Sequence, residues 1–191
     1  MGLIETPDLL KRHRITVDDY YRMAEAGVLA VDARVELIEG EIIDMAPMKS
    51  RHASAVAKLL ALLTSAVGQH AMVWCQLPLR LGKQSEPEPD LMLLRPRADF
   101  YADAHPVAAD VLLLIEVSDS TARYDREIKT PLYARHGVSE VWIVDLDSRV
   151  LRTLRQPVRG KYTEITETAT PGKLAPHALP KMSIDLSSLL G

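Results

Sequence analysis

Two carboxylates beside apolar strands are the residues of this sequence that most need a chemical explanation. Glu116 directly follows the apolar run 111–115, which is typical of an interior strand. An ionised carboxylate there is costly unless a base pairs with it or a metal binds it. Asp90 opens the preceding apolar run, 91–94. Because ligands gather at one end of such sheets, the two acids could converge, and hard oxygen ligands suit Mg²⁺ or Mn²⁺.

Each acid also has a purely structural interpretation. Glu116 could form a salt bridge with a base on the following segment, and the bases there are Arg123, Arg126 and Lys129. Asp90 follows a proline, and a Pro-Asp pair alone is mostly a turn signal. The two acids together are therefore more informative than either one.

Two further charged residues could join this site. Glu36 alternates with Val35 and Leu37, so in a strand it points away from their face, either to solvent or to the same site. Lys129 could stabilise the charge that develops on a phosphorus centre, or orient an attacking water. Alternatively, Lys129 could simply face solvent on an amphipathic helix. Tyr133 lies one turn further on the same face.

The predicted elements run in the order α-β-β-α-β-β-β-α-β-β, an α/β (α+β) chain with a mixed central sheet flanked by helices. Thr16 and Asp19 form a capping box for the first helix, and Ser50 caps the second. Around Pro131, either a helix capped by Asp125 kinks, or a new helix begins with Thr130 as its cap and Pro131 at its first position. We expect helices over 16–27, 51–69 and 125–136, and a terminal helical turn over 184–190. We expect a hairpin over 34–45 and strands over 72–81, 90–94, 111–118, 138–146, 149–155 and 161–167.

Composition restricts the class of protein. The chain has 191 residues, with 23 Lys and Arg against 26 Asp and Glu. We expect one domain, 1–191, with an N-terminal extension over 1–14 and a core over about 15–190. The single cysteine, Cys75, excludes a disulfide scaffold and a multi-cysteine zinc site. Slight acidity argues against a protein that coats nucleic acid by bulk charge, but not against a local, metal-loaded site.

Signals for a membrane or for secretion are missing from the sequence. No apolar run approaches the ~18–20 residues of a membrane span, and no secretory apolar region opens the chain. We therefore expect a cytoplasmic protein without a membrane partner. Motifs of serine hydrolases, phosphate loops, dinucleotide folds and zinc proteases are also missing, and no organic cofactor is expected.

A locally basic stretch, 149–161, is the candidate surface for nucleic acid. A solvated hairpin is the more common explanation of such a stretch. We assign Arg152 and Arg155 as candidate DNA contacts, together with His52 and Tyr133. The bases of the stretch are Arg149, Arg152, Arg155, Arg159 and Lys161.

Several segments together resemble a known family. They are ELIEGEIIDMAP at 36–47, His52, EPEPDLMLL at 86–94, and IEVSDSTARYDREIKTPLYARHGVSEVWIVD at 115–145. In this order they closely resemble the Uma-type restriction endonuclease family, a domain-of-unknown-function group in the PD-(D/E)XK nuclease superfamily. The resemblance covers about 15–190. It implies a restriction-endonuclease-like αβββαβ core with a metal-dependent phosphodiesterase site.

The resemblance also implies roles for individual residues. Asp90 and Glu116 match the metal-binding acids of the superfamily, and Glu36 matches the upstream acid of the family. The superfamily usually has a lysine two residues after the second acid, where this sequence has Ser118. The family supplies its lysine from the following helix, and Lys129 matches that migrated position. Lys129 can substitute only if its ammonium reaches the same point in space.

These observations lead to one expected function and two alternatives. We expect a Mg²⁺- or Mn²⁺-dependent DNA endonuclease, with the carbonyl of Val117 as a further metal ligand. A homodimer is plausible because double-strand cutting needs two sites. Ser118 motivates the first alternative, a non-catalytic module with a nuclease fold that binds nucleic acid or a protein. The second alternative is a hydrolase of another phosphate ester.

Overall fold

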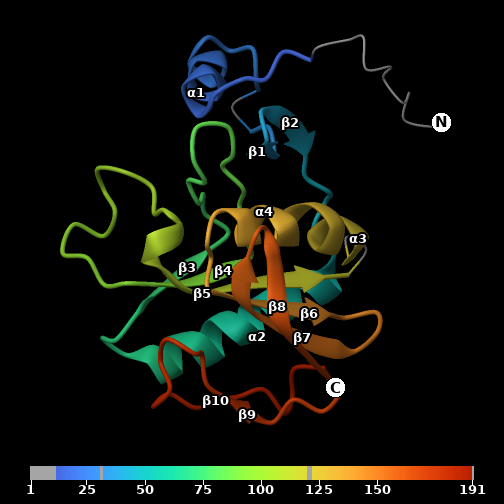
Figure 1. Ribbon diagram of the computed structural model, residues 1–191. Coiled ribbons are helices and arrows are strands. Elements are labelled where there is room, and N and C mark those ends of the chain that lie inside the picture. Colours follow the sequence, from blue (N-terminus) through green and yellow to red (C-terminus); the bar gives the residue numbers. More distant parts are fainter. Residues whose placement is uncertain (1–11, 31, 120–121, 191) are drawn as a thin grey trace.

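A six-stranded mixed sheet with the strand order β3-β4-β5-β6-β7-β8 lies at the centre of the molecule (Figure 1). The computed structural model describes residues 12–30, 32–119 and 122–190, so most of the expected extension 1–14 lies outside the described residues. Only β5 and β6 pair in parallel, because a helical crossover joins them. The strands are β3 Met72–Cys75, β4 Leu91–Leu94, β5 Val111–Ser118, β6 Glu140–Asp145, β7 Val150–Val158 and β8 Lys161–Thr168.

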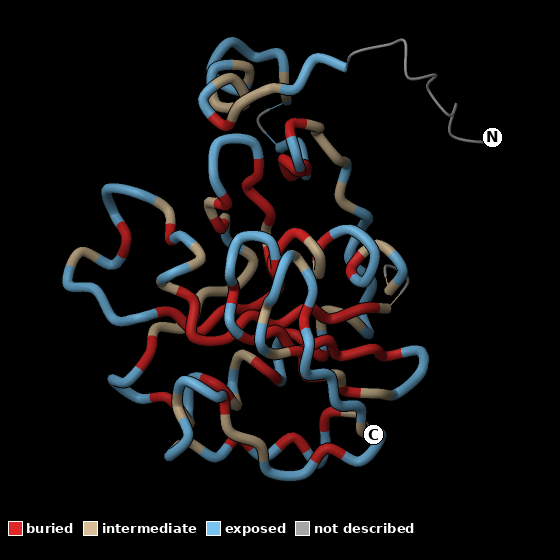
Figure 2. Tube along the Cα trace, in the orientation of Figure 1, coloured by how far each residue is buried: buried red, intermediate tan, exposed pale blue. Residues whose placement is uncertain are grey.

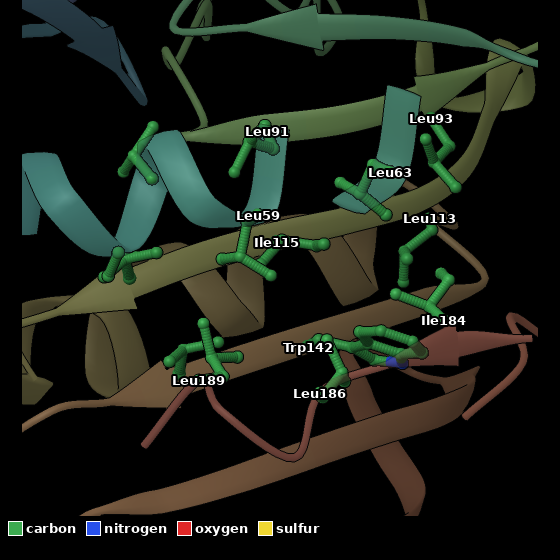
Figure 3. Close-up of a cluster of buried hydrophobic side chains, with 14 of the residues drawn as sticks. Leu59, Leu63, Leu91, Leu93, Leu113, Ile115, Trp142, Ile184, Leu186 and Leu189 are labelled. Atoms are coloured by element: carbon green, nitrogen blue, oxygen red, sulfur yellow. The ribbon is translucent and has the colours of Figure 1, made fainter. Parts of the chain in front are cut away.

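Helices cover both faces of this sheet, and its central strands β4, β5 and β6 are buried at every position, whereas β8 at the edge is mostly exposed (Figure 2). On one face lies α2 (Ser50–Val67), whose Leu59 and Leu63 pack in the same cluster as Leu113 and Ile115 of β5 (Figure 3). The C-terminal segment closes this cluster through a small ladder of β9 (Lys173–Leu174) and β10 (Ile184–Asp185). On the other face lies the crossover segment, which ends in α4 (Thr130–Arg135).

Alternation along β5 sends its polar residues to the crossover face. Leu113, Ile115 and Val117 belong to the α2 cluster. Because neighbouring residues of a strand point to opposite faces, Glu116 and Ser118 point to the crossover segment. The strand is buried at every position. Glu116 is therefore a buried acid whose partners must come from the crossover.

A separate hairpin and a short helix complete the fold at the opposite end from α2 (Figure 1). The hairpin consists of β1 (Val35–Ile38) and β2 (Glu41–Asp44), and Gly40 turns it with a φ of 77°. A Cβ at Gly40 would lie 2.7 Å from that of Arg14, so this turn requires glycine. The helix is α1 (Val17–Glu25), which begins with the predicted capping box of Thr16 and Asp19.

The mixed α+β class with a central sheet is confirmed, whereas three local predictions are wrong. The second helix begins at Ser50 with Lys49 as its N-cap, so Ser50 is not the cap. The strand expected over 72–81 ends at Cys75, because Gln76 has a φ of 50°. The expected helical turn over 184–190 is instead β10 followed by a turn. None of the described helices is long and apolar enough to cross a membrane.

Candidate active site

A cleft of about 210 Å³ opens where β4 and β5 meet the hairpin, the first turn of α2 and the crossover. The elements that form it come from four parts of the chain, so only the folded molecule brings its side chains together. All four of the charged residues singled out from the sequence line it, together with His52 and Asp125. The charged lining therefore includes Glu36, His52, Asp90, Glu116, Asp125 and Lys129.

Asp90 is held at the start of β4 by contacts on both of its carboxylate oxygens. One oxygen lies 2.9 Å from Nε2 of His52 and accepts a hydrogen bond of 3.2 Å from the side chain of Gln76. The other accepts a 2.9 Å bond from the backbone N–H of Val117. The hydrogen bond to Asp90 raises the pKa of His52 above its ordinary value. No local pattern predicts this pairing, because α2 and β4 are distant in the chain.

Glu116 points from β5 into the crossover, as the alternation of the strand requires. The Tyr133 hydroxyl donates a short hydrogen bond to it, and Nζ of Lys129 lies 3.2 Å from the same oxygen. Its other oxygen lies 3.4 Å from the backbone nitrogen of Asp90. Burial raises the pKa of Glu116 to about 8, although the neighbouring ammonium of Lys129 opposes this. A nearby positive charge therefore stabilises the ionised form of Glu116.

Lys129 connects Glu116 to Glu36 of the hairpin. Its Nζ lies 3.2 Å from a carboxylate oxygen of each acid, and all three side chains are less than a tenth exposed. Tyr124 donates a 3.1 Å hydrogen bond to the other oxygen of Glu36. Burial alone lowers the pKa of Lys129, but the carboxylates of Glu116 and Glu36 outweigh burial and raise it. Lys129 is thus a permanent cation and not a proton acceptor.

A wide helical turn places Lys129 in the cleft. The crossover consists of α3 (Ala122–Tyr124), a π-helical turn over Asp125–Lys129 and α4. Pro131 has no N–H for the carbonyl of Glu127, and its ring would press on that carbonyl in a regular α-helix. The backbone N–H of Thr130 instead donates to the carbonyl of Asp125. Such turns occur often at functional sites.

Thr130 does not cap α4, whose N-cap is Lys129, and Asp125 does not cap its own turn, whose N-cap is Tyr124. The carboxylate of Asp125 is buried and accepts a 2.7 Å hydrogen bond from the hydroxyl of Ser118 at the end of β5. Ser118 therefore ties the strand to the same turn that carries Lys129. The only local signal for this pairing is a polar residue, Ser118, at the end of an apolar strand.

Comparisons with known proteins agree with this architecture. Residues 17–187 match the model of a family named Uma2 and described as "Putative restriction endonuclease". The chain belongs to the Uma2 family. This confirms the resemblance found in the sequence. A search of curated proteins found no match.

A solved structure shares the fold of this Uma2 chain. It is the crystal structure of "a putative nuclease belonging to DUF820" from Anabaena variabilis ATCC 29413. The two chains are 19% identical, and the match covers 92% of this chain and 97% of that chain with a TM-score of 0.71. At this identity the likeness concerns the fold. It supports the assignment of the central sheet and its flanking helices.

The donor chemistry of the cleft fits a hard divalent cation. Glu36, Glu88, Asp90 and Glu116 supply carboxylate oxygens, which are the ligands that Mg²⁺ and Mn²⁺ prefer. Burial, with help from Glu36, also raises the pKa of Glu88. In the described ranges, however, no three His, Cys, Asp or Glu side chains are grouped around a single point. The acids instead lie against Lys129 and His52.

Three of the candidate nucleic-acid contacts lie in places that limit such a role. Tyr133 is fully buried and bonds to Glu116, so its ring is not available to a base. Arg152 pairs with Asp145 and Glu167. Arg155 pairs with the buried Glu140. The structure thus uses both arginines to join neighbouring strands, and His52 alone of the four lines the cleft.

Proposed function

We propose that this Uma2 chain is a metal-dependent nuclease that hydrolyses phosphodiester bonds of DNA in the cleft. The observation that carries the proposal is the buried ammonium of Lys129 between Glu36 and Glu116, beside Asp90 at the end of the central sheet. A site that combines a fixed cation with surplus carboxylates suits a reaction in which negative charge develops on a phosphoryl group. Membership in a family described as restriction endonucleases supports the same substrate class.

Each side chain of the cleft has a role in this proposal. Asp90 and Glu116 would hold Mg²⁺ or Mn²⁺, with Glu36 and the carbonyl of Val117 as further oxygen donors. The ion would supply Lewis-acid activation of a water and of the phosphoryl oxygens. Lys129 would stabilise the charge of the phosphoryl group that is attacked, because its raised pKa keeps it protonated.

Other side chains keep these groups in position. His52 and Gln76 fix the carboxylate of Asp90 from outside the strand. Tyr133 fixes Glu116, and Tyr124 fixes Glu36. Such supporting hydrogen bonds orient the ligands of metal sites and raise their basicity.

Cleavage of DNA tests the proposal directly. The purified chain is expected to nick or cut plasmid DNA with Mg²⁺ or Mn²⁺ and not with EDTA. Asp90→Ala and the isosteric Asp90→Asn are expected to abolish the reaction, because both remove a negative ligand. Asp103→Ala, at an exposed acid outside the cleft, is the matched control. Equal cleavage by wild type and both Asp90 variants would contradict the assignment.

One observation favours a second candidate, a module with a nuclease fold that binds nucleic acid without cutting it. Lys129 already pairs with both Glu36 and Glu116, and no three of the described acids are grouped around a single point. This candidate predicts DNA binding without cleavage and no heat of Mn²⁺ binding in titration calorimetry. Hydrolysis of a generic phosphodiester substrate by a chain that neither binds nor cuts DNA would instead indicate a hydrolase of another phosphate ester. Double-strand cutting would in addition require two sites, supplied by a homodimer.

A further inference from the structure

A second pocket of about 210 Å³ lies beside α2, outside the cleft. One face of the helix forms its wall, because Arg51, Ser54 and Lys58 recur at helical spacing along α2. The opposite wall is the turn after β6, which contributes Arg149. Apolar side chains, including Leu189, form the rest of the lining. Three cations and no carboxylate therefore line this basic pocket, which we define by Arg51, Lys58 and Arg149.

The cations of the basic pocket differ in how they are held. Arg51 donates to the backbone carbonyl of Leu146 and contacts Asp147 at 3.1 Å and Asp119 at 3.4 Å. Lys58 and Arg149 are exposed and form no ion pair with any residue that the structure describes. Arg51 is thus a fixed donor, whereas the other two charges are free to bind an anion. Arginine and lysine together are the usual protein partners of phosphate.

The basic pocket adjoins the candidate active site through α2. Arg51 precedes His52, which contacts Asp90 in the cleft, and Asp119, the partner of Arg51, lines the cleft as well. The first turn of α2 contains no acidic residue and has no side-chain cap. The partial positive charge of this helix end therefore lies between the cleft and the pocket. A phosphate that binds next to this helix end, on the side of the basic pocket, would meet favourable charge.

We propose that the basic pocket binds a backbone phosphate of the DNA that flanks the phosphodiester in the cleft. This inference rests on the proposed function, since it assigns the second phosphate of the same substrate. It places the main DNA contacts on α2 and the turn after β6. It also explains how a chain with a formal net charge of -3 can bind a polyanion, because a few unpaired cations gather beside the site.

Binding of a labelled DNA duplex in EDTA tests the inference without cleavage. The double variant Lys58→Glu and Arg149→Glu is compared with the control pair Lys83→Glu and Arg95→Glu, which makes the same change of charge at exposed residues outside both pockets. Fluorescence anisotropy over a range of KCl concentrations gives Kd and its salt slope. We expect the pocket variant to weaken binding about tenfold or more and to flatten the slope by about 1–2, since each lost phosphate contact removes about 0.9. The control should lie near wild type.

The outcomes separate this inference from the proposed function. If wild type cuts DNA but the pocket variant binds it as well as the control pair does, the inference fails and the nuclease assignment stands. If wild type never cuts DNA but the pocket variant alone loses binding, the basic pocket is a DNA contact of a non-catalytic module. If wild type binds no DNA, both proposals fail. Circular dichroism verifies that each variant is folded.

Discussion

Lys129 is the single residue on which the proposed chemistry of the cleft depends most. It is buried, it contacts two acids at 3.2 Å, and its raised pKa keeps its charge at neutral pH. We expect Lys129→Met to lower kcat for DNA cleavage by about 10²–10³, the usual effect of removing one group that stabilises charge in a transition state. Steady-state kinetics with plasmid DNA measures kcat.

Stability and binding provide the controls for this variant. Removal of one partner of a buried ion pair costs about 3–5 kcal/mol, so the Tm of Lys129→Met should also fall. Methionine keeps the apolar stem of the side chain, and circular dichroism below the new Tm shows whether the fold persists. Duplex affinity in EDTA should change little. A folded variant with wild-type kcat would show that Lys129 has only a structural role.

Asp145 supports a prediction about acid stability. Burial alone would raise its pKa, but hydrogen bonds from Ser148 and Arg152 outweigh burial and lower it. A lowered pKa means that the ionised acid stabilises the fold above its unfolded pKa, near 4, and that this stability is lost as pH falls through the folded pKa. Asp145→Asn should therefore reduce the free energy of unfolding by about 1–3 kcal/mol at pH 7, and by progressively less as pH falls through the folded pKa.

Urea unfolding between pH 2.5 and 7 measures this difference. Glu25→Gln is the control, because Glu25 is exposed at the end of α1 and should change stability little at any pH. If the free energies of unfolding of wild type and Asp145→Asn differed by the same amount at every pH from 2.5 to 7, the ion pair with Arg152 would be excluded as the cause of the difference.

The charged side chains of the cleft could be found in the sequence, but their partners could not. Glu116 stood out because an acid followed an apolar run, and the family resemblance added Lys129. The bond of His52 to Asp90 and that of Tyr133 to Glu116 join elements that are distant in the chain. The residues around His52 and Tyr133 in the sequence do not distinguish these two partners from ordinary surface or core residues.

At the scale of elements, the π-helical turn is the feature that brings Lys129 to the cleft. Its five residues, Asp125–Lys129, contain one more residue than a regular turn needs. Deletion of the exposed Glu127 should remove the extra residue of this turn and rotate the segment before it by about 100° relative to Lys129. Asp125 would then lose Ser118. We expect the deletion to abolish DNA cleavage while circular dichroism shows an intact sheet.

Substitution at the same position controls for the lost side chain. Glu127 pairs on the surface with Arg123, and such pairs contribute only about 0.3–0.5 kcal/mol. Glu127→Ala should therefore keep both fold and cleavage. Full activity of the deletion variant would mean that the turn accommodates the change and does not set the position of Lys129.

The same comparison shows which elements a sequence can predict. The sequence predicts both the β5 strand and the capped helix α1, because an apolar run and a capping box are local signals. The short β3 was predicted too long, because the strand ends at the left-handed Gln76 and not at a recognised turn residue. The sequence predicts either a kink or a new helix at Pro131, whereas the structure has a π-helical turn directly before it, in which the Thr130 N–H donates to the carbonyl of Asp125.

For the whole molecule, the surplus of acid in the cleft predicts how a metal ion changes stability. Glu36, Glu88, Asp90 and Glu116 lie near one another with Lys129 as the buried cation between two of them. Repulsion among these carboxylates weakens the metal-free fold, and burial of the charges adds to this cost. A divalent ion that binds only the folded chain offsets the repulsion and stabilises the fold by mass action.

Thermal unfolding with Mn²⁺ measures this coupling apart from any activity. At 100 times its Kd, an ion bound at one site adds about 2.7 kcal/mol, which raises Tm by about 5–10 °C for a chain of this length. Asp90→Asn should lose most of the shift, because it removes a negative ligand and leaves the shape unchanged, while Glu25→Gln should keep all of it. Equal shifts in all three proteins would place the ion elsewhere. No shift in any of them would mean that the folded chain binds no Mn²⁺, as expected of a module that binds DNA and does not cut it.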